Sequence, residues 1–117
     1  MPMRTAVTCL LAALTSVSGV AAAERESELY RLYYDAEVLS FCGMASPRTK
    51  VGFDRRLAAL IERDTWTDDG HRAVRRRAWV AAHREWNNRS LGGYKAWCDD
   101  EGHAALVRLH GYAGSSD

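Results

Sequence analysis

Apolar side chains recur at helical intervals between residues 24 and 45, which predicts a first helix over this range. Gly43 and the Ser46-Pro47 pair predict where this helix ends, because glycine and proline interrupt a helical chain. The apolar positions form two adjoining rows, and so wide a stripe indicates a helix that packs against two neighbours. One row is Leu29, Tyr33, Ala36 and Leu39, and the other is Tyr30, Tyr34, Val38, Phe41 and Cys42.

A second, shorter helix is predicted from Asp54, a fair N-cap residue, to about Asp64. Residues 47–53 are expected to be a connector. Leu57, Leu60 and Ile61 recur at helical spacing and are the predicted buried face, whereas the charged positions between them are expected to face water.

A third helix is predicted from about Gly70 to Arg89, after a turn in which Asp68 or Asp69 serves as the cap. Its alanines leave room for a close neighbour. Asn87-Asn88 and Gly92-Gly93 then interrupt the pattern, and the sequence leaves open whether the third and fourth helices are one kinked helix. The fourth is predicted from Tyr94 to His110, with an inner face of Trp97, Cys98, Ala105, Leu106 and Leu109.

No sustained apolar alternation indicates a strand, so the predicted fold is all-α: a small bundle of three to four helices. Residues 24–110 are expected to form a single helical domain, and residues 111–117 a flexible C-terminal tail. A chain of this length accommodates one domain with a modest core.

Residues 1–23 have the pattern of a secretory signal peptide. Arg4 precedes an uncharged apolar stretch, and three alanines come directly before Glu24. The stretch is short and rich in small polar residues, which disfavours a membrane span. We therefore expect a periplasmic or secreted protein with no integral membrane span after cleavage. Removal of this segment would also discard Cys9.

The two remaining cysteines, Cys42 and Cys98, predict a disulfide in an oxidising compartment. The bond would close a loop of roughly 57 residues, which the chain-entropy model values at roughly 4 kcal/mol. It would join the end of the first helix to the start of the last. The alternatives are two free thiols or a metal pair, and the spacing favours neither.

Charge is balanced overall but concentrated locally. Without Arg4 the chain has 15 basic and 15 acidic residues, which argues against a nucleic-acid partner. Between Gly70 and Lys95 there are seven basic residues and one acidic residue, Glu85. One interpretation is a face that contacts an anion or a partner protein. The other is that the basic helix pairs with the acidic first helix.

The tryptophans allow two interpretations. Trp79 and Trp97 are predicted core residues, because large aromatic side chains provide much of the apolar area of a small domain. Trp66, in a polar turn, and Trp86, between Glu85 and Asn87, are more ambiguous. An exposed tryptophan beside arginines would be a contact site, since both residue types are enriched where proteins bind one another.

The remaining chemistry does not point to an enzyme. Asp35 and Glu37 lie among tyrosines, where a carboxylate could act as an acid, but pairing with Arg76 or Arg84 is the favoured expectation. The four histidines match no metal-ligand spacing, and no nucleophile elbow or phosphate loop occurs. We expect no catalytic residues, no metal and no cofactor.

These patterns predict a non-enzymatic binding or accessory module for another protein of the cell envelope or periplasm. The alternative is a binder of a small anionic ligand or an anionic lipid surface through the arginine-rich helix. The candidate contact residues in either case are Arg72, Arg75, Arg76, Trp86 and Arg89.

Overall fold

The computed structural model describes residues 23, 25–89 and 92–114 of the chain. These residues form a small all-α bundle fastened by a Cys42–Cys98 disulfide, so the predicted fold class is confirmed. The predicted signal peptide lies outside the described residues except for Ala23, as do residues 115–117 of the predicted tail. The described elements are the first helix (residues 25–41), then α2, α3, α4, the π-helical segment η1 and α5.

The first helix ends at a left-handed glycine. Gly43 has a φ of 66°, a conformation that glycine adopts without a Cβ clash. The backbone N–H of Met44 donates to the carbonyl of Leu39, and that of Gly43 donates to the carbonyl of Ser40. This pair of bonds is the Schellman motif, which satisfies carbonyl groups at the helix end. Gly43 therefore marks the end of the helix as predicted, but the helix itself ends at residue 41 and not at residue 45.

The second helix is longer than predicted. Helix α2 spans Pro47–Arg63, so residues 47–53 are not a connector and Asp54 is not the cap. Ser46 is the N-cap, and its hydroxyl accepts from the Thr49 backbone while the Thr49 side chain bonds back to the Ser46 N–H. Proline suits the first helical position because its missing N–H would have no partner there. Asp54 lies within the helix and pairs with Lys50 at 2.6 Å.

Helix α3 spans Asp68–Asn87. Its cap is Thr67, not either predicted aspartate, and the Thr67 hydroxyl accepts a hydrogen bond from the Gly70 N–H. Asp68 and Asp69 occupy the first turn instead, where negative charge complements the helix dipole. The buried line is Val74, Ala78 and Ala82.

The last predicted helix consists of three consecutive segments. These are α4 (Gly93–Trp97), η1 (Cys98–Gly102) and α5 (His103–Ala113). The wide π turn inserts one extra residue, which returns Trp97 and Ala105 to the same side within about 20°. Both side chains are buried, together with Leu109. Helix α5 also continues beyond the predicted end at His110, because Ala113 is buried in the bundle.

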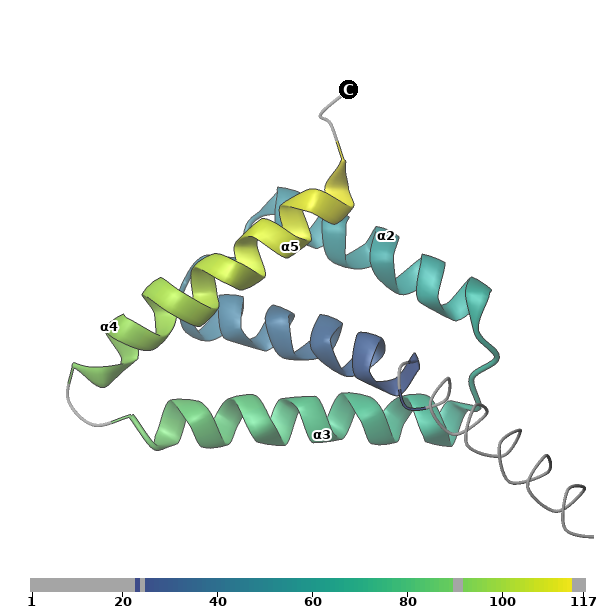
Figure 1. Ribbon diagram of the computed structural model, residues 1–117, viewed down its shortest axis with the longest axis horizontal. Coiled ribbons are helices and arrows are strands. Elements are labelled where there is room, and N and C mark those ends of the chain that lie inside the picture. Colours follow the sequence, from purple (N-terminus) through teal and green to yellow (C-terminus); the bar gives the residue numbers. More distant parts are fainter. Residues whose placement is uncertain (1–22, 24, 90–91, 115–117) are drawn as a thin grey trace, which may run out of the picture.

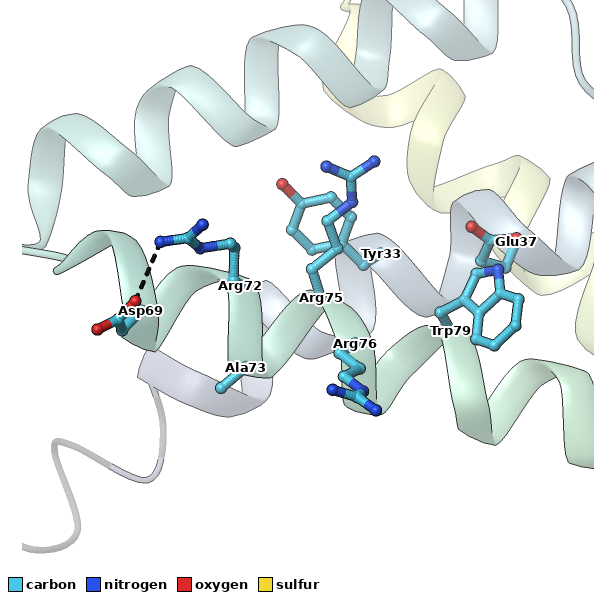
Figure 2. A pocket seen from close by; sticks show the side chains of 8 residues that line it. All are labelled: Tyr33, Glu37, Asp69, Arg72, Ala73, Arg75, Arg76 and Trp79. Carbon is cyan, nitrogen blue, oxygen red and sulfur yellow. Dashed lines mark hydrogen bonds and ion pairs between the residues drawn. The ribbon is translucent and has the colours of Figure 1, made fainter.

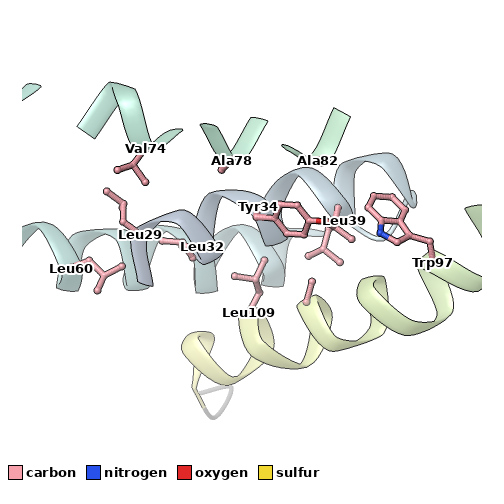
Figure 3. Packing of buried hydrophobic residues seen from close by; sticks show 12 residues of the cluster. Leu29, Leu32, Tyr34, Leu39, Leu60, Val74, Ala78, Ala82, Trp97 and Leu109 are labelled. Atoms are coloured by element: carbon pink, nitrogen blue, oxygen red, sulfur yellow. The ribbon is translucent and has the colours of Figure 1, made fainter. Parts of the chain in front are cut away.

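The first helix lies between α3 and α5. Figure 1 shows α3 running alongside it, with α2 and α5 crossing each other on the opposite side. In Figure 3, Val74, Ala78 and Ala82 reach the first helix from one side and Leu109 from the other. The core cluster between these elements includes Leu29, Leu32, Val38, Leu39, Leu60 and Trp97. Of the predicted buried face of α2, only Leu60 is fully covered, whereas Ile61 is exposed.

Two close contacts fix the α5 side. A Cβ placed on Gly52 of α2 would lie 1.8 Å from the carbonyl oxygen of Leu109, so only glycine fits where these helices cross. Asp35, 1% exposed, accepts two hydrogen bonds from Arg108 of α5, at 2.7 and 2.9 Å. The prediction that Asp35 pairs with Arg76 or Arg84 is wrong, because its carboxylate faces α5 and not α3.

Candidate functional site

An open groove of about 650 Å³ lies along the N-terminal half of α3, where this helix borders the first helix. Arginine, aromatic and acidic side chains line it. Figure 2 shows these side chains, which are Tyr33, Glu37, Asp69, Arg72, Ala73, Arg75, Arg76 and Trp79. The groove therefore brings together three of the five predicted contact residues, Arg72, Arg75 and Arg76.

Tyr33 forms the rigid wall of the groove. Its ring packs edge-on against Phe53 of α2, with centroids 5.5 Å apart, and its hydroxyl oxygen lies 2.6 Å from His71 Nε2. Burial raises the pKa of the Tyr33 phenol, and the positive charge of Arg75 partly offsets this effect. Because neighbours from two helices hold the ring, Tyr33 has little rotamer freedom to lose when a ligand binds.

The three arginines differ in what they contact. Arg72 pairs with Asp69 at 3.0 Å across one helical turn, which partly neutralises it. Arg75 lies over the Tyr33 ring, 5.7 Å from its centroid. Figure 2 shows Arg72 and Arg75 on the same edge of α3, with Arg76 pointing the other way. Among the described residues, Arg75 and Arg76 have no ion-pair partner.

Trp79 closes one end of the groove and is 48% exposed. The prediction that it belongs to the core is wrong, because the first helix packs so closely on Ala78 and Ala82 that the neighbouring indole lies at the flank. One side of the indole packs on His83, with centroids 3.8 Å apart. His83 in turn packs edge-on against Phe41. Trp79 is thus the exposed end of a row of packed rings that runs through His83 to Phe41.

Glu37 of the first helix lies at the same end. Figure 2 shows its carboxylate beside the Trp79 ring. No ion pair joins Glu37 to any described residue, so the predicted pairing with Arg76 or Arg84 is absent from this part of the chain. The groove consequently has a negative group at the end that is farthest from Arg72.

The other two predicted contact residues lie elsewhere. Trp86 is half-buried and stacks on Phe41 with centroids 5.1 Å apart, near Tyr94 and Trp97. Arg89 pairs with Glu85 and lies over the ring of Trp97, which is 4% exposed and forms part of the core as predicted. Both are at the C-terminal end of α3, next to Gly92, and do not line the groove.

A second hollow, of about 360 Å³, lies between the first helix and the second half of α3. Its charged side chains include Arg31, Arg84, Glu85 and Glu101. Arg31 lies over the Tyr34 ring, 5.4 Å from its centroid. Burial and the charges of Glu101 and Glu85 raise the pKa of the Tyr34 phenol. The two arginines and two glutamates balance in charge, and no tryptophan lines this hollow. It is therefore the weaker candidate.

Among residues 23, 25–89 and 92–114, no three histidine, cysteine or acidic side chains gather closely enough to hold a metal ion. Within the same ranges, no helix is both long and apolar enough to cross a membrane.

Sequence patterns pointed to the arginines of this site but missed Tyr33, Glu37 and Trp79 as their companions. The available signal was the i, i+4 series of Val74 and two alanines, which defines a narrow buried line on α3. A tryptophan one position off that line falls at its border. Tyr33 and Glu37 are four residues apart on the first helix and therefore share a face, but nothing in the sequence shows that this face borders Arg75.

No protein-family model matches the chain, and no curated protein or solved structure is significantly similar to it.

Proposed function

We propose that the protein is a non-enzymatic binding module, which docks a segment of another exported protein in the groove along α3. The observation that carries the proposal is a concave surface with an exposed tryptophan and two arginines, Arg75 and Arg76, that lack ion-pair partners among the described residues. Tryptophan and arginine are the residues that most often dominate binding energy between proteins.

Arginine charge that the fold does not use is available to a partner. Arg108 is held by a buried carboxylate, and Arg63 bonds to both Asp64 and Glu28. Arg75 contacts an aromatic ring, which leaves its guanidinium donors exposed to an incoming acceptor. We therefore propose that an acidic side chain of the partner segment contacts Arg75.

Export of the protein is part of the same proposal. The signal-peptide pattern of residues 1–23 supports it, and so does the Cys42–Cys98 disulfide, because such bonds persist in oxidising compartments. The partner would then be another protein of the cell envelope or periplasm.

Quantitative co-purification with the tagged protein tests the proposed function. We expect Arg75→Gln combined with Trp79→Ala to reduce specifically captured proteins by about tenfold, an effect typical of losing a hot-spot contact. Arg77→Gln is the matched control, because Arg77 is an exposed arginine of α3 that lines neither hollow. Equal capture by all three proteins would contradict the proposal.

The volume of the groove favours one second candidate, a small anionic ligand. About 650 Å³ lies within the range of small-molecule sites. Titration of citrate and inorganic phosphate into the protein would test this alternative. Binding should weaken strongly as salt is added, since exposed charge pairs are screened. Affinity that does not change with salt would exclude it.

A further inference from the structure

The charges of the groove are arranged along its length. Arg72 and Arg75 lie toward one end, and Glu37 lies beside Trp79 at the other (Figure 2). Arg75 and Trp79 are four residues apart on α3, which corresponds to about 6 Å along the helix axis. A purely acidic ligand that filled this length would place negative charge against Glu37.

The Glu37–Trp79 end suits a cation. An exposed indole attracts a cation to its face, and a neighbouring carboxylate adds a second attraction. His83 already covers one side of the indole, so the other side is the one a ligand can reach. Because Glu37 has no ion pair with a described residue, no resident cation has to be displaced.

The Arg72–Arg75 end suits an anion. The guanidinium of Arg75 packs over the Tyr33 ring, which limits its orientation. Asp69 partly neutralises Arg72, so Arg75 is the stronger of the two anion contacts. A ligand carboxylate at this end can accept hydrogen bonds from Arg75. A second ligand carboxylate at the Trp79 end would be repelled by Glu37.

We infer that the groove selects a peptide segment of mixed charge, with an acidic side chain at the Arg75 end and a basic side chain over Trp79 beside Glu37. This inference rests on the proposed function and specifies the chemistry of the docked segment. In an extended segment, side chains two residues apart lie on the same face and are separated by about 7 Å, which is close to the spacing of Arg75 and Trp79.

Three synthetic peptides with the same glycine-serine background test the inference. One has Asp and Lys two residues apart, one has Asp at both positions, and one has Lys at both. Binding is followed by the NMR shift of the Trp79 indole N–H, which is assigned with the Trp79→Phe variant. We expect the mixed peptide to bind about fivefold more tightly than either single-sign peptide, the gain typical of one exposed ion pair.

Two variants locate the selectivity. Glu37→Gln should abolish the preference for the mixed peptide over the Asp-Asp peptide, and Arg75→Gln should abolish its preference over the Lys-Lys peptide. Glu62→Gln is the control, since Glu62 is an exposed carboxylate of α2 that does not line the groove. It should leave both preferences unchanged.

The outcomes separate this inference from the proposed function. Tightest binding of the Asp-Asp peptide, or an unchanged preference in Glu37→Gln, would overturn the mixed-charge inference and leave an acid-binding groove. If none of the three peptides shifts the Trp79 signal at millimolar concentration, groove binding itself is overturned, and the proposed function with it.

Discussion

The first helix is used differently on its two sides. Toward α5 it is fastened by the disulfide at Cys42 and by the buried Asp35–Arg108 pair. Toward α3 the buried contacts are Val74, Ala78 and Ala82, and a groove remains open between Tyr33 and Trp79. Among the described residues, the one ion pair between these two helices is the exposed Arg77–Glu26 pair at 3.5 Å. The comparison shows that the buried carboxylate is paired on the α5 side, whereas Arg75, Arg76 and Glu37 on the α3 side have no ion-pair partner among the described residues.

Removal of the disulfide should have the largest effect on the fastened side. We expect the variant with both Cys42→Ser and Cys98→Ser to lose roughly 4 kcal/mol of unfolding free energy, because the denatured chain regains the entropy of an open loop. For a domain of this size, that loss lowers the Tm by roughly 15 °C or more. Differential scanning calorimetry measures it.

The control is the reducing agent. It should lower the Tm of the natural protein by a similar amount and leave the double variant unchanged. An identical Tm for both proteins under oxidising conditions would contradict a stabilising disulfide.

Disruption of the buried ion pair should come next. Asp35→Asn should lower the free energy of unfolding by about 2–3 kcal/mol, because the substitution weakens the two charge-assisted hydrogen bonds that Arg108 donates to the buried carboxylate. The matched control is Asp69→Asn, which removes an exposed pair with Arg72 on the open side. That change should cost less than about 1 kcal/mol.

Urea denaturation compares the two variants. Equal losses in Asp35→Asn and Asp69→Asn would mean that the two sides of the first helix do not differ in how they use charge.

A methyl group added where α2 crosses α5 should lower the free energy of unfolding by a smaller amount. Gly52→Ala should destabilise by about 1–3 kcal/mol, since the added methyl group meets the Leu109 carbonyl and forces the helices apart. Gly111→Ala is the control, because nothing lies within 4 Å of its Cβ position in α5. It should be neutral or stabilise by up to about 1 kcal/mol. The same sign of change in both variants would contradict the close crossing.

Alkaline pH should give the smallest effect. Burial raises the pKa of Tyr33 and of Tyr34, so the folded state favours the neutral phenol. In the unfolded chain tyrosine ionises at about pH 10. The stability contribution is therefore complete below that pH and declines as pH rises through the raised values. Tyrosinate absorbance should show a late-titrating fraction that Tyr33→Phe and Tyr34→Phe each reduce. Normal titration of all five tyrosines would contradict it.

Much of the bundle could be predicted from the sequence because its signals are local. Helical periodicity located four helical regions, Gly43 marked an end, and the two cysteines outside the predicted signal peptide left one pairing. The start of α2 was mispredicted because the Ser46-Pro47 pair was interpreted as the end of the first helix and Asp54 as the cap of the second. Proline at the first helical position, followed by the Ser46–Thr49 capping box, was the local evidence for the correct start.

The partners across helices could not be predicted in the same way. Asp35 and Arg108 are separated by 73 positions, and sequence does not show which neighbour a given helix face meets. The exposure of Trp79 had the same cause, because it depends on how closely Ala78 approaches the first helix. The arginines of the groove were identified from local charge density alone, whereas the site they form with Tyr33 and Glu37 depends on that packing.

The disulfide also has a mechanical consequence. It joins residues 56 positions apart, and α2 and α3 lie inside the covalent loop that it closes. A pulling force applied to the two ends of the chain would pass from the first helix through the sulfurs into α5. Helix α3 could detach and return without lengthening the tether, whereas reduction would release roughly 190 Å of slack chain. Helix α3 and its side of the groove are therefore outside the load path for as long as the disulfide remains intact, whereas Tyr33 and Glu37 lie on the helix that bears the force.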